Sequence, residues 1–277
     1  MEGSISELRH GKTAPRIGEA FVKIYEFIKV DERNRIARLT LARAPLNVLN
    51  MAMLSEINAH LETLVGRQDL CALVIDGDGK VFSSGVDVPE HQKGTVDAMI
   101  GTFHKTFRIM HRLPMPTIAA AHGGAYGGAM ELAVFCDIIL AADDLRIGVP
   151  EIKLGVFPPL AVAHLAQIIG PKKAAELIFT GAIIQADEAL SIGLVNHVYP
   201  AAEFHATVEK FTERFSSLSA FSLYQVKRAF KRVVMPDVER ALDEAERIYL
   251  RDLMEGDDPS EGLNAFIEKR APVWADR

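Results

Sequence analysis

Short apolar segments alternate with segments of helical periodicity through the first 200 residues, and this alternation constrains the fold more than any other feature of the chain. Residues 72–76, 117–121 and 136–141 are mostly apolar runs followed by turn residues, which predicts buried strands. Before and between them, apolar residues recur at helical spacing over 54–64 and 99–110. Strands that alternate with helices in this way indicate an α/β core.

The two ends of the chain have different patterns. Near the start, alternating residues predict strands at 21–30 and 36–41. From residue 202 onward the apolar spacing is helical throughout. We therefore expect a loose N-terminal lead over 1–20, an α/β core over 21–200 and a helical region over 201–277. Further strands are expected at 146–149 and 194–199, and further helices at 160–169, 172–179, 186–192, 205–215, 222–233, 238–253 and 259–268.

The charge balance argues against some partners. The 277 residues include 31 Lys and Arg against 37 Asp and Glu, which gives a net charge of −6 without a run of like charge. Nucleic-acid binding and a polybasic membrane patch therefore have no support in the composition. No apolar stretch is long enough to span a bilayer, and the first 20 residues lack the apolar run of a signal peptide. Cys71 and Cys136 lie in apolar segments, which is typical of reduced thiols in a cytoplasmic protein.

A glycine-rich segment, residues 122–131, lies between a predicted strand and a predicted helix. Such a turn presents free backbone N–H groups and the positive end of a helix dipole to a ligand, although close packing of strand and helix explains the glycines equally well. Its paired glycines do not form the G-x-G-x-x-G dinucleotide motif, and Gly79-Lys80-Val81 is not a P-loop. His122-Gly123-Gly124 is similar to an esterase motif, but the chain has no G-x-S-x-G nucleophile elbow.

Two glutamates in apolar segments are candidates for chemistry. Glu131 follows the glycines at the start of a predicted helix, and Glu151 comes twenty residues later. A single glutamate there is accounted for by the helix dipole. Two carboxyl groups in one pocket push their pKa values apart, so that one donates a proton while the other stays ionised. The turn at 82–87 is a second candidate, because with Gly128 it could supply two N–H groups to one oxygen, as an oxyanion hole does.

Several motifs occur in a recognisable order. F-S-S-G-V-D at 82–87 is followed by G-x-x-x-G-G-A-x-E-L-A at 123–133, P-E-I-x-L-G at 150–155 and E-G-L-N-A-F-I-E-K-R at 261–270. Together they resemble the crotonase (enoyl-CoA hydratase/isomerase) family, over residues 21–272. The resemblance implies an α/β fold of repeated ββα units in a superhelical core. It also implies a helical C-terminal region that assembles a homotrimer or homohexamer.

The resemblance also implies roles for individual residues. Val86 and Gly128 match the two oxyanion-hole donors of the family, and Glu131 and Glu151 match the two catalytic glutamates of its hydratases. Having both carboxyl groups favours addition or removal of water across a conjugated thioester. No metal and no redox cofactor is implied, since the thioester is the electron sink and coenzyme A is part of the substrate. Residues that match coenzyme A or substrate contacts are Leu46, Ser84, Asp87, Val88, Gly127, Pro159 and Lys269, the last of which is equally well explained as a solvated lysine.

One segment departs from ordinary hydratases. Residues 156–164 read V-F-P-P-L-A-V-A-H where a glycine-rich turn is usual. With Glu90-His91, this loop is similar to the cyclohexa-1,5-diene-1-carboxyl-CoA hydratases of anaerobic aromatic degradation, whose product is 6-hydroxycyclohex-1-ene-1-carboxyl-CoA. Leu160 and Val162 are then expected to shape a blunt acyl pocket. His91 and His164 are either extra acid–base groups or surface and packing histidines. The alternatives are a general short-chain enoyl-CoA hydratase, an enoyl-CoA isomerase and an RNA-binding relative.

Overall fold

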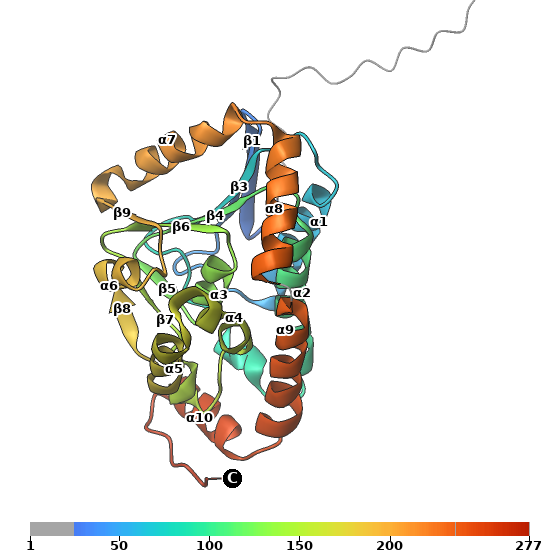
Figure 1. The fold of residues 1–277 in the computed structure, drawn as a ribbon. Helices are drawn as coiled ribbons and strands as arrows, with labels where there is room; N and C mark the ends of the chain where they lie inside the picture. Colours follow the sequence, from blue (N-terminus) through green and yellow to red (C-terminus); the bar gives the residue numbers. More distant parts are fainter. Residues whose placement is uncertain (1–24, 236, 277) are drawn as a thin grey trace, which may run out of the picture.

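The computed structural model describes residues 25–235 and 237–276. The predicted N-terminal lead, and the start of the predicted strand at 21–30, lie outside these residues. Within them, the larger of two sheets has six strands in the order β1-β2-β3-β4-β6-β9 (Figure 1). β1 and β2 are antiparallel, and every other pair is parallel. The strands are β1 (Ile28–Arg33), β2 (Ile36–Leu41), β3 (Ala72–Gly77), β4 (Thr117–Ala121), β6 (Ile138–Ala142) and β9 (His197–Tyr199).

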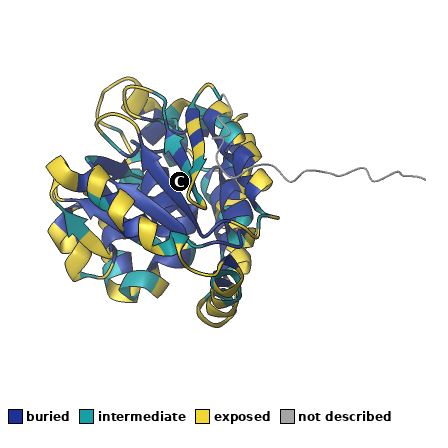
Figure 2. Ribbon diagram, turned by 90° about the horizontal axis from the view of Figure 1, so that it is seen from above, coloured by how far each residue is buried: buried dark blue, intermediate teal, exposed yellow. Residues whose placement is uncertain are grey.

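Both faces of the central strands are covered. Every residue of β3 and β4 is buried, as expected for parallel strands that read as continuous apolar runs. On one face, alternate strand residues such as Val74 and Ile118 pack against Phe204 and Val208 of helix α7 (Phe204–Ser216). Their neighbours face the main core. Figure 2 shows the result, with dark blue strands at the centre and exposed residues on the surrounding helices.

A second, three-stranded sheet has the order β5-β7-β8, with β5 parallel to β7 and β7 antiparallel to β8. Its strands are β5 (Gly124–Tyr126), β7 (Arg146–Gly148) and β8 (Ile183–Gln185). β5 and β8, of three residues each, were not predicted. Since β5 continues directly from the turn after β4, the glycine-rich segment is part strand and part turn. It therefore holds a defined position next to β7.

The remaining helices surround the two sheets. The predicted helices at 54–64, 99–110, 160–169, 172–179 and 186–192 are all present, with somewhat different ends. They are α1 (Met51–Leu64), α2 (Val96–Arg112), α4 (Pro159–Ile169), α5 (Pro171–Thr180) and α6 (Ala186–Ser191). The helix expected near Gly128 is α3 (Gly128–Val134), and three short 3₁₀ helices are η1 (Val88–His91), η2 (Pro150–Leu154) and η3 (Ala201–Glu203).

The predicted ends of three strands were wrong, each because a backbone N–H has another partner. The amides of Glu26 and Phe27 donate to the Glu56 carboxylate, so β1 begins only at Ile28. Cys136 N–H donates to Ala133 and closes α3, which leaves β6 to begin at Ile138. In the same way the amides of 194 and 195 both donate to the carbonyl of Ala189, and β9 is limited to 197–199. Cys71 and Cys136 are both buried and unpaired, as expected.

The helical C-terminal region packs back onto the α/β core. α9 (Val238–Arg247) lies against α4, and α10 (Asp258–Ile267) lies against η1 and η2. Glu246 of α9 accepts a hydrogen bond from His104 of α2 at 2.7 Å and from Arg108 at 3.0 Å. The predicted helix at 238–253 changes at Ile248 into a π-helix, η4. The helices are α8 (Ala220–Val234), α9 (Val238–Arg247), η4 (Ile248–Leu253) and α10 (Asp258–Ile267). None of the helices in the described part of the chain has the length and apolarity to cross a membrane.

Candidate active site

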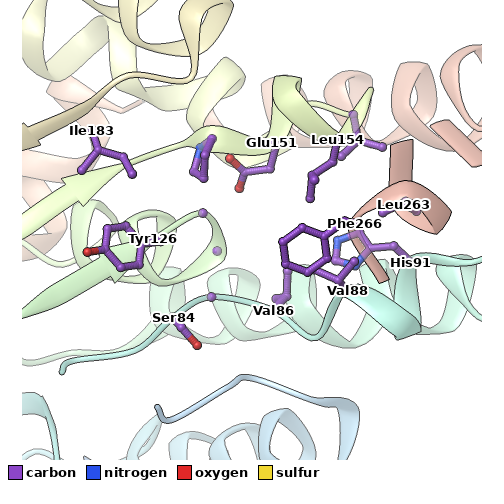
Figure 3. A pocket seen from close by; sticks show the side chains of 15 residues that line it. Ser84, Val86, Val88, His91, Tyr126, Glu151, Leu154, Ile183, Leu263 and Phe266 are labelled. Carbon is purple, nitrogen blue, oxygen red and sulfur yellow. The ribbon is translucent and has the colours of Figure 1, made fainter. Parts of the chain in front are cut away.

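A cavity of about 290 Å³ lies where the C-terminal ends of several strands meet the C-terminal helix. Figure 3 shows its walls: Ser84, Val86 and Val88 on one side, Tyr126 and Glu151 opposite, and Leu263 and Phe266 of α10 at the end. Most of the lining is apolar, and the polar side chains in it are Ser84, His91, Tyr126 and Glu151. A small apolar cavity with a few convergent polar groups is typical of a substrate site.

Hydrogen bonds join the two turns that sequence analysis singled out. Ser83 N–H donates to the Gly124 carbonyl at 3.1 Å, and Tyr126 N–H donates to the Ser83 carbonyl at 3.3 Å. The Ser84 amide donates to the carbonyl of Leu46 at 2.9 Å, which places Leu46 beside the same turn. Segments that are some 40 to 80 residues apart in the chain are therefore held together at one wall of the cavity.

Val86 and Gly128 both line this cavity. Gly128 is the first residue of α3, so its N–H has no carbonyl within the helix to donate to. Neither amide donates a hydrogen bond to any other residue that the structure describes. The two residues are in contact, because a Cβ added to Gly128 would lie 2.9 Å from Cγ1 of Val86. Two neighbouring free donors are suited to bind one oxygen that gains negative charge.

Glu131 projects from the first turn of α3 and is only 2% exposed. Its Oε1 accepts a hydrogen bond from the Ala161 amide at 2.9 Å, and the Leu160 amide also contributes. Both donors belong to the first turn of α4, where N–H groups have no helical partner. Burial raises the pKa of Glu131 to about 7, and these two amides oppose the rise. The two amides therefore stabilise the ionised form of the Glu131 carboxyl group.

Glu151 lies in η2, and its carboxyl group reaches toward the glycine turn (Figure 3). The backbone of Gly127 passes close to it, because a Cβ on Gly127 would be 2.5 Å from Oε1 of Glu151. Oε2 of Glu151 is enclosed and has no hydrogen-bond partner among the described residues. Burial and the negative charge of Glu131 raise the pKa of Glu151 well above its ordinary value. The negative charge of Glu131 thus favours the protonated form of Glu151.

The other predicted contact residues are placed in two groups. Of the predicted contact residues, Ser84, Val88 and Gly127 line the cavity. Of the residues with predicted catalytic roles, Val86, Gly128 and Glu151 line it, whereas Glu131 lies behind its wall. Leu46 adjoins it through Ser84, as described above. Asp87, Pro159 and Lys269 do not line it, although the Asp87 carbonyl accepts a hydrogen bond from His91. Lys269 is exposed just after α10.

The expected effect of the Pro-Pro segment on the pocket was wrong. Pro159 is the first residue of α4, where proline is favoured because it has no N–H to satisfy. Leu160 is buried against the core and Val162 is exposed, so neither lines the cavity. Because the segment forms a helix start and not a loop, the amides that follow it point at Glu131. Val156, just before the prolines, is the residue of this segment that reaches the cavity.

Several residues that line the site were not predicted to belong to it. Leu263 and Phe266 come from a helix that was expected only to assemble subunits, and Tyr126 was noted only as part of the glycine motif. Both histidines left open are buried. His91 lines the cavity, whereas His164 packs edge-on against Phe135. Burial lowers the pKa of both, to about 4 for His164, so neither is a charged surface group.

Comparisons with known proteins identify the family of the chain. The chain matches the enoyl-CoA hydratase/isomerase family over residues 31–277. It is 36% identical to a probable enoyl-CoA hydratase of Mycobacterium tuberculosis, over 91% of this chain and 99% of that protein. It is 35% identical to the cyclohexa-1,5-dienecarbonyl-CoA hydratase of Thauera aromatica, over 87% of this chain and 93% of that protein.

Solved structures give the same result for the fold. The crystal structure of an enoyl-CoA hydratase from Mycobacterium avium subsp. paratuberculosis matches with a TM-score of 0.82 at 28% identity, over 91% of this chain and 99% of the other. An enoyl-CoA hydratase/isomerase from Pseudoalteromonas atlantica matches with a TM-score of 0.81 at 27% identity, over 90% and 100%. The chain is therefore an enzyme of the enoyl-CoA hydratase/isomerase (crotonase) family and has the fold of that family.

Proposed function

We propose that this enzyme is a hydro-lyase that reversibly adds water to a conjugated enoyl or dienoyl thioester of coenzyme A. The observation that carries the proposal is the pairing of Glu131 and Glu151 beside the free amides of Val86 and Gly128. An isomerase needs only to move a proton, which one carboxyl group does. Hydration needs a base for water and an acid for carbon at the same time, and this site offers both.

The chemistry follows from the two protonation states. The Val86 and Gly128 amides bind the thioester oxygen and stabilise it as the acyl group becomes an enolate. The Glu131 carboxylate takes a proton from water, whose oxygen bonds to the β-carbon. Glu151 then gives its proton to the carbon skeleton, and the carbonyl is restored. After this step Glu131 is protonated and Glu151 is ionised. A proton then returns from Glu131 to Glu151, through water or by exchange with solvent, before the next turnover.

Coenzyme A would enter along the side of the cavity formed by the 84–88 turn. Ser84 and Val88 line it, and Leu46 lies next to Ser84 through the hydrogen bond between their backbones. Lys269 is exposed just after α10, so it could bind a phosphate group that reaches this end of the helix. We assign it that role within an assembled enzyme, in which a neighbouring subunit brings its coenzyme A to this lysine.

The acyl group that we propose is a cyclic diene, with cyclohexa-1,5-diene-1-carboxyl-CoA hydrated to the 6-hydroxycyclohexene thioester. The similarity to the Thauera aromatica enzyme supports it, but a probable enoyl-CoA hydratase is as similar. The cavity adds a second argument. Val88, Leu154 and Leu263 give it short apolar walls, and Phe266 covers one end, which suits a compact ring better than a long flexible chain. In a cyclic diene, the proton from Glu151 would be added at the far end of the conjugated system.

The test compares crotonyl-CoA, the cyclic dienoyl-CoA and a longer straight-chain enoyl-CoA with one enzyme preparation. The expected preference for the ring is tens- to hundreds-fold in kcat/KM, because a methylene that fits such a pocket is worth about 1–3 kcal/mol. Loss of conjugated absorbance and uptake of oxygen from labelled water identify hydration. If kcat/KM for crotonyl-CoA is equal to or higher than that for the cyclic dienoyl-CoA, the protein is a general short-chain hydratase. Double-bond migration without oxygen uptake makes it an isomerase.

Self-assembly is the second part of the proposal. α8 presents an exposed apolar face that includes Val226, Phe230 and Val233. A patch of large apolar residues on one helix indicates a protein interface more often than a free surface. A homotrimer, or a hexamer made of two trimers, would cover it. Sedimentation equilibrium measures the mass directly, and a monomer at micromolar concentration would contradict this part of the proposal.

A further inference from the structure

Trp274, the single tryptophan of the chain, packs against two elements that form walls of the cavity. A Cβ added to Gly155 would lie 3.0 Å from Cζ3 of the indole, and one added to Gly262 would lie 2.9 Å from Cη2. Gly155 ends the 3₁₀ helix η2, and Gly262 belongs to α10. One edge of the indole therefore lies between these two elements, although the side chain as a whole is 41% exposed.

η2 and α10 approach each other closely where the indole lies, because both residues there are glycine. A Cβ on Gly262 would be 2.1 Å from the Leu154 carbonyl oxygen, and one on Gly155 would be 2.9 Å from that of Asp258. Neither glycine has a side chain that could fill the space beside these backbone contacts. The indole of Trp274 supplies this apolar surface, and a large aromatic side chain contributes strongly to packing.

Both elements carry residues that line the cavity. η2 contributes Leu154, next to Glu151, and α10 contributes Leu263 and Phe266. These three apolar side chains lie at the same end of the cavity in Figure 3. If α10 moved away from η2, this end would widen, whereas the amides of the glycine turn would stay in place. The space for an acyl group therefore depends on how closely α10 packs on η2.

Hydrogen bonds to α10 hold the backbone on both sides of Trp274. Before it, the Val273 amide donates to Oε1 of Glu261 at 2.7 Å. After it, the next two amides donate to the Asp258 carboxylate at 2.6 and 3.0 Å. Both acceptors belong to the first turn of α10. The position of the indole is therefore fixed relative to the helix that it packs against.

We propose that Trp274 determines acyl-chain specificity by holding α10 against η2, so that Leu263 and Phe266 close the end of the cavity that receives the acyl group. Trp274 does not line the cavity, so it is a positioning residue that acts through α10. The inference deepens the proposed function and rests on it, since it requires the acyl group to lie at this end. Compact acyl groups are then favoured over long ones by a residue outside the cavity.

The first test is the variant Trp274→Ala, which removes the indole. The measured quantity is the ratio of kcat/KM for oct-2-enoyl-CoA to kcat/KM for the compact substrate. The compact substrate is whichever of crotonyl-CoA and the cyclic dienoyl-CoA has the higher kcat/KM with the wild-type enzyme. We expect the ratio to rise about tenfold or more, since one methylene that fails to fit a close pocket costs about 10- to 200-fold.

This ratio separates specificity from stability. Two substrates compared with one preparation meet the same fraction of folded enzyme, so a loss of stability alone leaves the ratio unchanged. Trp274→Phe keeps an aromatic ring and should stay closer to the wild-type ratio than Trp274→Ala. The matched control is Val273→Ala, whose neighbouring side chain is 77% exposed and whose amide is retained. An equal rise in Val273→Ala would overturn the role of the indole.

The second test releases the indole without replacing it. The double variant Asp258→Ala, Glu261→Ala removes both acceptors of the amides beside Trp274. Because the chain has one tryptophan, quenching of its fluorescence by acrylamide reports directly whether the indole is released. The specificity ratio should follow the indole: it rises if quenching increases and stays at the wild-type value if quenching does not. A released indole with an unchanged ratio, or a raised ratio with the indole in place, would overturn the proposal.

Failure of this inference is distinct from failure of the proposed function. If the wild-type enzyme hydrates none of the three thioesters, the proposed function fails, and this inference fails with it. If the wild-type enzyme hydrates them and Trp274→Ala keeps the wild-type ratio, only the role of Trp274 fails.

Discussion

A Cβ atom on Gly127 would lie 2.5 Å from Oε1 of Glu151, so the carboxyl group occupies the space that any other residue at position 127 would fill. Gly127 also has φ 55° and ψ −126°, a conformation that is open only to glycine. Its backbone turns the chain from β5 into α3, and Gly128 follows with its free amide. One residue thus allows both the approach of Glu151 and the turn that presents the amide.

The first prediction concerns this glycine. Gly127→Ala should lower kcat by on the order of 10²-fold or more, because the methyl group displaces the Glu151 carboxyl by about an ångström. The control is Gly101→Ala in α2, where nothing lies within 4 Å of an added Cβ. This variant should keep full activity and be slightly more stable, as alanine favours a helix. Steady-state kinetics and thermal melts measure both. Normal activity in Gly127→Ala would contradict the placement of Glu151 in the site.

The second prediction concerns the two carboxyl groups. Glu131→Gln and Glu151→Gln should each reduce turnover by on the order of 10²–10⁴-fold, the usual contribution of general acid–base catalysis. Thioester binding should change little, because neither side chain is needed to hold coenzyme A. Isothermal titration with a non-reactive acyl-CoA separates binding from turnover. A variant that binds and still turns over at the wild-type rate would remove that glutamate from the mechanism.

The third prediction concerns the amide of Gly128. Gly128→Pro removes this N–H, and proline is tolerated at the first position of a helix. The added ring atoms also crowd Val86 and Phe103, each 2.9 Å from the position of a Cβ. Gly128→Ala therefore serves as the control, since it has the same Cβ and keeps the N–H.

If this amide binds the thioester oxygen, Gly128→Pro should be less active than Gly128→Ala by about 10²–10³-fold. Circular dichroism and oligomer size verify that both variants are folded and assembled. Equal activity in the two variants would show that the clash matters and the N–H does not.

The fourth prediction concerns pH. Activity should rise as Glu131 ionises, at a pKa of about 7, and fall at higher pH as Glu151 loses its proton. The kcat/KM profile of the free enzyme is therefore expected to be bell-shaped on the alkaline side of neutrality. Glu151→Gln should lose the alkaline limb, because glutamine does not titrate. A profile that is flat from pH 6 to 9 would contradict the assignment of the two roles.

The same pKa shifts affect stability. Between pH 4.5, the ordinary pKa of a glutamate, and about 7, the folded protein binds more protons at Glu131 than the unfolded chain does. Stability therefore falls as pH rises through this window, by roughly 3 kcal/mol for this group. Glu131→Gln should accordingly melt at a higher temperature than the wild-type protein at pH 8, and the difference should shrink toward pH 5. Thermal melts across this range measure it.

Local signals account for what could be predicted. The apolar runs of β3 and β4 are buried on both faces, and the helical spacing of α1 and α2 is clear. The two strands were therefore predicted to within one residue, and the two helices to within three residues at each end. The order of the glycine and glutamate motifs indicated the family and the four residues with candidate catalytic roles. Such motifs are readable because each turn and its functional residue lie within a few positions of one another.

Long-range packing decided the rest. The hydrogen-bond partner of a backbone amide can lie far along the chain. The Phe27 amide donates to Glu56, 29 residues away, and not to a strand. Phe266 lines the cavity because α10 folds back over η2, and no local pattern records that contact. The Pro158-Pro159 pair is compatible with a stiff loop or with a helix start.

The sequence by itself determined which segments are buried, where the chain turns and which groups have the chemistry for acid–base catalysis, because these depend on side-chain type and short-range geometry. Only the tertiary structure decided that Glu131 is held by the Ala161 amide while Oε2 of Glu151 has no such partner. It also decided that the protonated form of Glu151 is favoured, since burial and the charge of a neighbour set a pKa. Both depend on distances across the fold, which no spacing along the chain contains.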